Sequence, residues 1–156
     1  MDARALEFWI GAWHCSWSGG HGTNSITREL DDRVVVERFK AEGPEPFHGM
    51  SISVFDERVG WRQTWVDSNG SYWHFEGSTL DDGSPVFATP EPVDVDRAYK
   101  RMVFSNITAQ GFEWRWESSP DGDRWHERWS IAYSRIAWGD GLLESNRAAC
   151  RVRASG

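Results

Sequence analysis

The chain has 156 residues, which is the length of one domain and enough to bury a hydrophobic core. Its net charge of −7 excludes an extended basic surface, so nucleic acid and anionic membranes are not expected partners. Eleven tryptophans are more than core filling requires, because each indole is large and carries an N–H that needs a partner. The excess favours an aromatic-lined pocket for a small molecule.

The cysteines, Cys15 and Cys150, lie far apart in the sequence. The first seven residues lack the apolar core of a signal peptide, and no apolar run is long enough to span a membrane as a helix. These features predict a soluble cytoplasmic protein with reduced thiols.

The first part of the chain predicts a helical turn followed by strands. Residues 2–9 suit one or two helical turns that plug one end of a barrel, with Asp2 as the cap. Residues 9–17 alternate so that Trp13, Trp17 and their neighbours form an aromatic face. Strands are also predicted at 21–30, 33–41 and 47–56. Glu37 shares a face with Val35 and is either an edge device or a cavity group.

The pattern of residues 60–77 predicts a β-hairpin that turns at Asn69-Gly70, because Asn-Gly is a strong hairpin signal. One side of its first strand carries Gln63, Trp65 and Asp67, which suits the wall of a polar and aromatic cavity better than a sealed core. Trp73 follows in the second strand.

The remaining strands are predicted at 86–89, 98–107, 111–118 and 124–135. Arg101 lies in the second of these, Trp114 and Trp116 share one face of the third, and Trp129 shares a face with Tyr133 in the fourth. Residues 89–96 form a predicted lip over the barrel mouth.

About ten short strands joined by tight turns predict an all-β fold, an antiparallel up-and-down barrel with an N-terminal helical plug. Ten strands enclose more room than side chains readily fill, so a ligand cavity is expected. The predicted barrel covers residues 1–138, and residues 139–156 form a tail with a short helix at 142–149.

Three motifs resemble an uncharacterised family of bacterial calycin-like barrels, which is similar to lipocalins, fatty-acid-binding proteins and nitrobindins. They are F-W-I-G-A-W near the start, W-R-Q-T-W-V-D in the middle, and W-E-S-S-P-D-G-D-R-W near the end. The resemblance implies an antiparallel barrel with a small-molecule cavity, and it implies no particular activity.

Cofactor sites have weak support in the sequence. Nitrobindin-like barrels bind haem through one histidine near the C-terminal end, where this chain has His126. His126 alternates out of phase with Trp129, so a surface histidine is the preferred interpretation and no cofactor is expected. No spacing typical of a metal or dinucleotide site is present.

The sequence therefore predicts a Trp-lined lumen that binds an apolar or aromatic molecule, in bacterial secondary metabolism. The predicted ligand-binding residues are Trp13, Trp17, Gln63, Trp65, Trp73, Arg101, Trp114, Trp116, Trp129 and Tyr133. The first alternative is a cofactor-independent cyclase or isomerase with Asp67 or Glu37 as its proton-handling group. Two others are haem binding and a homodimer whose tryptophans face the partner.

Overall fold

The computed structural model describes residues 1–43, 46–93 and 95–137, which form one closed antiparallel barrel of ten strands. The strands are β1 (Gly11–Trp17), β2 (Gly20–Glu29), β3 (Val34–Glu42), β4 (Phe47–Asp56), β5 (Gly60–Asp67), β6 (Tyr72–Thr79), β7 (Pro85–Ala88), β8 (Tyr99–Ser105), β9 (Gly111–Ser119) and β10 (His126–Arg135).

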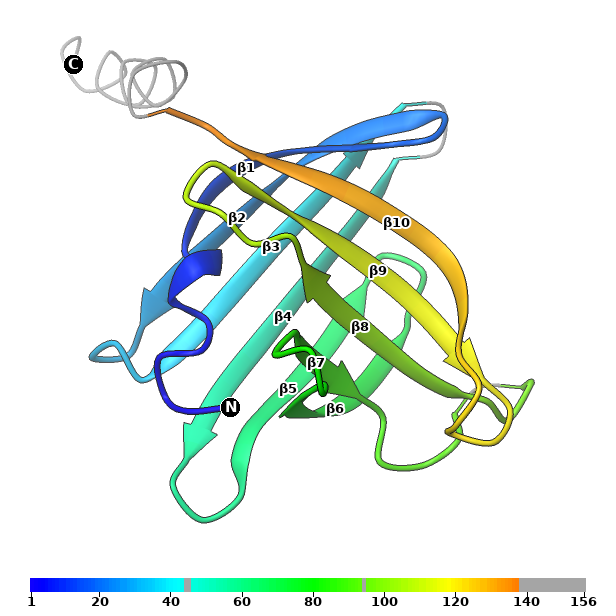
Figure 1. Cartoon of the computed structure of the whole chain (residues 1–156). Helices are drawn as coiled ribbons and strands as arrows, with labels where there is room; N and C mark the ends of the chain where they lie inside the picture. Colours follow the sequence, from blue (N-terminus) through cyan, green and yellow to red (C-terminus); the bar gives the residue numbers. More distant parts are fainter. Residues whose placement is uncertain (44–45, 94, 138–156) are drawn as a thin grey trace, which may run out of the picture.

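Each strand pairs with its neighbours in sequence, and β1 pairs with β10 to close the barrel (Figure 1). The closing register runs from Trp13 opposite Arg135 to Ser16 opposite Ala132. The predicted up-and-down barrel is therefore confirmed. Closure leaves none of the ten described strands with an unpaired edge, which removes the usual site of sheet-to-sheet aggregation.

Strand alternation places nearly all of the described tryptophans on the inner side of the barrel. Of the ten in the described residues, nine belong to the hydrophobic cluster inside the barrel, and Trp125 lies outside it. A homodimer held by several outward-facing tryptophans therefore has little support in this part of the chain. The indole-bearing sides of the strands converge on the interior, as their period of two predicts.

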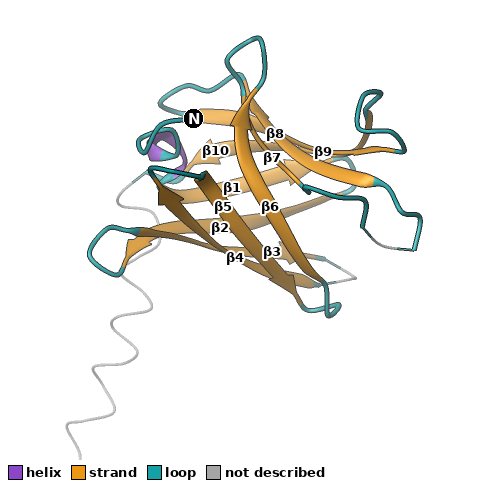
Figure 2. Ribbon diagram, turned by 90° about the horizontal axis from the view of Figure 1, so that it is seen from below, coloured by secondary structure: helices purple, strands orange, loops and turns teal. Residues whose placement is uncertain are grey.

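An N-terminal segment closes one end of the barrel. Its helical part is the 3₁₀ helix η1 (Glu7–Trp9), which packs against that end (Figures 1 and 2). Leu6 and Trp9 are fully buried there, and Trp61 donates its indole N–H to the carbonyl oxygen of Asp2 at 2.8 Å. The predicted plug is confirmed, although the first strand begins at Gly11 and Trp9 belongs to the plug.

A β-bulge in β10 interrupts the regular alternation of inward and outward side chains. Glu127 pairs with Glu117 and Trp129 with Trp116, so the register shifts between Glu127 and Trp129. Trp129 therefore points inward while Glu127 falls on the outer side, contrary to simple alternation. A bulge inserts one residue and reverses the facing of everything beyond it.

The predicted tail at 139–156 and its short helix lie outside the described residues. Within the described part of the chain, no helix has the length and apolar character needed to cross a bilayer.

Candidate functional site

A cavity of about 270 Å³ lies in the lumen, at the end opposite the N-terminal plug. Its mouth includes Asn69 and Ser71, from the β5–β6 hairpin. Among the described residues, the lining consists of Glu37, Phe39, Phe47, Trp65, Asp67, Asn69, Ser71, Trp73, Phe75, Met102, Trp114, Trp116, Trp129, Ile131 and Tyr133. These side chains are mostly aromatic, and none of them is basic.

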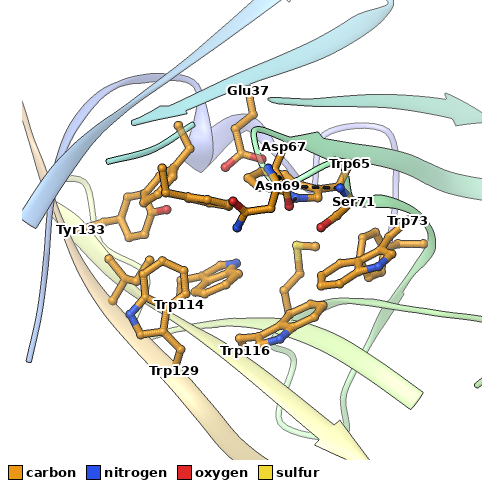
Figure 3. A pocket seen from close by; sticks show the side chains of 15 residues that line it. Glu37, Trp65, Asp67, Asn69, Ser71, Trp73, Trp114, Trp116, Trp129 and Tyr133 are labelled. Atoms are coloured by element: carbon orange, nitrogen blue, oxygen red, sulfur yellow. Dashed lines mark hydrogen bonds between the residues drawn. The ribbon is translucent and has the colours of Figure 1, made fainter. Parts of the chain in front are cut away.

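One side of the lining is a wall of regularly stacked indole rings, called the indole wall below. Trp73 stacks on Trp116 with ring centroids 5.0 Å apart and planes 4° from parallel, and Trp114 continues the row at 6.2 Å from Trp116. Trp129 stands edge-on to Trp114 at 5.6 Å. These rings come from β6, β9 and β10 and project toward one space (Figure 3).

Local sequence explains how the wall forms. On β9, Trp114 and Trp116 point inward while Glu113 and Arg115 point outward, so the strand has one aromatic and one charged face. On β4, the small residue Gly49 makes room for a ring of the next strand. A Cβ atom at Gly49 would lie 2.0 Å from the Trp65 ring, so only glycine fits beneath that indole.

Asp67 anchors the mouth of the cavity. Its Oδ2 accepts the indole N–H of Trp65 at 2.9 Å, and its Oδ1 accepts the backbone N–H groups of Asn69 at 2.9 Å and Ser71 at 3.1 Å. Partial burial opposes ionisation, but these hydrogen bonds outweigh it and lower the pKa of Asp67. Asp67 is therefore an ionised group whose oxygens orient Trp65 and the hairpin turn.

Glu37 is the second carboxylate of the cavity and has the opposite character. Its side chain is 7% exposed, and its two oxygens accept hydrogen bonds from Asn24 Nδ2 and Ser51 Oγ, each at 2.7 Å. Desolvation raises the pKa of Glu37 despite these two hydrogen bonds. The sequence left open whether Glu37 was an edge device or a cavity group, and the structure places it in the cavity.

Glu37 belongs to a buried polar network whose members come from the neighbouring strands β10, β1, β2, β3 and β4. Asn24 Nδ2 also lies 3.2 Å from the Tyr133 hydroxyl oxygen, and Tyr133 is in hydrogen-bond contact with Cys15. Burial raises the pKa of Cys15 to about 12 and raises the pKa of Tyr133 well above its usual value. Both groups therefore stay neutral near pH 7, and Glu37 is the member of the network able to change its charge.

The structure brings most of the predicted site residues together. The following line the cavity: Glu37, Trp65, Asp67, Trp73, Trp114, Trp116, Trp129 and Tyr133. Trp17 packs edge-on against Trp129 at 5.3 Å without lining the cavity. Trp13 is fully buried and does not line the cavity. Gln63 is also buried, and its side-chain amide N–H donates to the hydroxyl oxygen of Ser53 at 2.9 Å.

Arg101 lies on the outer wall rather than in the lumen. Its guanidinium donates to Glu117 Oε2 at 2.6 Å and lies 4.1 Å from the ring centroid of Trp125. Its strand neighbour Met102 takes the inward position and lines the cavity. The sequence predicted a polar contact from Arg101 to the ligand, and this placement directs that side chain away from the lumen.

The histidine considered for haem is also outside the cavity. The bulge puts His126 in register with Ser118, yet its imidazole is exposed, as are those of the other four histidines. The residues of the lumen therefore do not offer a histidine ligand to haem. Across the described residues, no group of three acidic, histidine or cysteine side chains is placed to hold a metal ion.

Sequence reasoning missed several lining residues and the partners of Glu37. The missed lining residues are Phe39, Phe47, Asn69, Ser71, Phe75, Met102 and Ile131. Phe39, Phe75 and Ile131 share strand and parity with residues that were predicted, so alternation could have found these three. Ser51 lay on the small polar side of β4, but its bond to Glu37 depends on the register between β3 and β4.

Comparison with known proteins leaves the family of this chain open: no protein-family model matches it, and no curated protein does.

Proposed function

We propose that this barrel binds a small, flat, mostly apolar molecule in its lumen, with the ring system of the ligand against the indole wall. The main observation that supports this proposal is the row of parallel indoles, Trp73, Trp116 and Trp114, beside a cavity of about 270 Å³. The resemblance of the sequence motifs to calycin-like barrels, which implies a small-molecule cavity, also supports this proposal.

The contrast between two sets of tryptophans supports this proposal. Trp9 and Trp13 are sealed at the plugged end, whereas the cavity indoles stay only partly buried. Apolar surface left open to water is unfavourable, and a ligand that covers it gains roughly 25 cal/mol per Å². The cavity, at about 270 Å³, lies just below the range of roughly 300–1,000 Å³ that is typical of ligand sites, which favours a small ligand.

Binding of 1-naphthalenemethanol, followed by quenching of tryptophan fluorescence, tests the proposal. The expected result is saturable binding that weakens roughly tenfold in Trp116→Leu, because stacking and apolar contact are lost. Trp125→Leu is the matched control, since Trp125 lies outside the lumen beside Arg101 and its loss should leave the affinity unchanged.

Two results would contradict the proposal. One is no saturable binding of this probe or of similar two-ring compounds. The other is equal weakening by the Trp116 and Trp125 substitutions, since that would place the binding surface elsewhere.

A second candidate function, a cofactor-independent isomerase or cyclase acting on a hydrophobic biosynthetic intermediate, is favoured by the two carboxylates. Their surroundings shift the pKa of Glu37 upward and that of Asp67 downward. Opposite shifts within one cavity are typical of acid–base pairs in active sites. Glu37 is the better candidate for proton transfer, because the Asp67 oxygens already accept three hydrogen bonds.

The base-promoted ring opening of 5-nitrobenzisoxazole tests this candidate. A carboxylate removes the proton on C3 while the N–O bond breaks, giving a coloured cyanophenolate. An enzyme of this kind should accelerate the reaction above free carboxylate, with a rate that rises through the pKa of Glu37. The acceleration should vanish in Glu37→Gln and persist in Asp67→Asn, and a rate no faster than free carboxylate would count against catalysis.

A further inference from the structure

Among the residues that the structure describes, the carboxylate of Glu37 has neutral hydrogen-bond donors and no cationic partner. Asn24 and Ser51 each donate one hydrogen bond to it, and none of the ion pairs among the described residues includes Glu37. An ionised carboxylate offers about four acceptor positions, so two donors leave part of its capacity unused. An ionised carboxylate buried without a counter-charge is unfavourable, so a cation would complete this site.

The charge of the cavity lining favours a cation from outside. In the described part of the chain, the lining contains two carboxylates, Glu37 and Asp67, and no lysine, arginine or histidine. Asp67 is already held by Trp65 and by two backbone N–H groups of its own turn. The net charge of −7 adds a negative potential that draws cations and repels anions.

Indole rings face Glu37 across the cavity. In Figure 3 the Glu37 carboxylate enters from one side, and the rings of Trp114 and Trp129 lie on the other side. The faces of indole rings attract cations more strongly than those of other aromatic side chains. An ammonium group beside Glu37 would thus have a carboxylate on one side and aromatic rings on the other.

We infer that the ligand of this lumen is an organic cation, a flat and mostly apolar molecule with a protonated amine. The ammonium group donates to the Glu37 carboxylate, and the ring system lies along the indole wall. This inference rests on the proposed function and names the chemical class of its ligand.

Proton linkage gives the inference a distinctive signature. The ammonium group pairs with ionised Glu37, so its affinity falls as the pH drops and Glu37 becomes protonated. The neighbouring titratable groups, Cys15 and Tyr133, have raised pKa values and stay neutral in the same range. Asp67, with its lowered pKa, stays ionised there. The pH dependence therefore reports on Glu37.

Four naphthalene probes of nearly equal shape separate the possibilities. They are 1-naphthalenemethanamine, which is cationic at pH 7, 1-naphthalenemethanol and 1-acetonaphthone, which are neutral, and 1-naphthoate, which is anionic. The amine should bind at least roughly tenfold more tightly than the alcohol, as expected for a hydrogen bond between charged groups in a largely buried site. The naphthoate should bind most weakly.

Two variants test whether Glu37 causes the preference for the amine over the alcohol. Glu37→Gln should bring the amine to within about threefold of the alcohol and remove the pH dependence. Glu76→Gln is the matched control, because it makes the same chemical change on the exposed outer side of β6, and it should keep the preference. If Glu37→Gln fails to fold, the pH series on the unmodified protein still decides, since the amine must lose affinity at low pH while the alcohol does not.

The outcomes separate this inference from the proposed function. Equal binding of amine and alcohol, or a preference that survives Glu37→Gln, overturns the cationic ligand and leaves aromatic binding in place. Tighter binding of the ketone than of the amine also overturns it, because Glu37 would then act as a protonated donor. No binding of any probe overturns both.

Discussion

Arg135 fastens the plugged end of the barrel, and its removal gives the sharpest prediction for stability. Its guanidinium donates to the carbonyl oxygens of Ile10 at 2.9 Å, Phe8 at 3.0 Å and Ala109 at 2.9 Å. It also lies 4.0 Å from the ring centroid of Trp13. One side chain thus joins the N-terminal segment, the β8–β9 connection and the end of β10.

The expected cost follows from these contacts. Three hydrogen bonds at about 1 kcal/mol each and a cation–π contact of about 0.5–1 kcal/mol predict that Arg135→Ala lowers the free energy of unfolding by about 3–4 kcal/mol. Arg135→Lys keeps the charge but not the planar fork of donors, so it should lose about 2 kcal/mol. Urea unfolding followed by tryptophan fluorescence measures both values.

A substitution at Gly11 tests the same contact from the other side. A Cβ atom at Gly11 would lie 2.4 Å from Arg135 Nη1, and the positive φ of +140° adds backbone strain. Gly11→Ala should therefore displace the guanidinium, and its cost combined with Arg135→Ala should fall short of the sum by at least about 1 kcal/mol. Additive costs, or a loss below about 1 kcal/mol for Arg135→Ala, would refute this reasoning.

Three other predictions concern the lumen. Burial raises the pKa of Glu37 from its ordinary 4.5, so the folded state holds this proton more tightly than the unfolded state, and the protein loses stability as the pH rises from 4.5 through the raised value. Glu37→Gln should accordingly gain stability relative to the unmodified protein as the pH rises through the raised value, and urea midpoints that keep a constant difference from pH 4 to 8 would speak against it. Gly49→Ala should displace the Trp65 ring, break its 2.9 Å bond to Asp67 and cost about 1–3 kcal/mol in urea unfolding, whereas an unchanged midpoint would show that the ring has room to move. Because burial raises the pKa of Cys15 to about 12, iodoacetamide at pH 8 should alkylate it only as the protein unfolds, and rapid labelling of its peptide in mass spectra would contradict the buried placement.

Strand alternation made much of the site accessible to sequence reasoning. Trp114 and Trp116 alternate with charged residues, so their common inward face followed from the pleat of a strand. The Asn69-Gly70 turn fixed the hairpin, and Gly70 has the positive φ of 82° that such turns require. Of the residues predicted to form a cavity wall on β5, Trp65 and Asp67 line the cavity, whereas Gln63 is buried outside it.

Alternation specifies a face but not a height along the barrel axis. Trp13 and Trp129 both point inward, yet Trp13 is sealed near the plug and Trp129 lines the cavity. That difference depends on the N-terminal segment, which fills one end alone. The bulge near Glu127 likewise reverses a face, and no residue type in that stretch marks it.

By itself the sequence determined the class of fold, the approximate strand boundaries and the inward direction of nearly all the tryptophans, since these depend on local periodicity and turn residues. Tertiary structure alone decided that Glu37 meets Asn24 and Ser51, that Arg101 lies outside, and that one end of the lumen stays hollow. These features depend on the register between neighbouring strands, which hydrogen bonds across the whole closed barrel fix together.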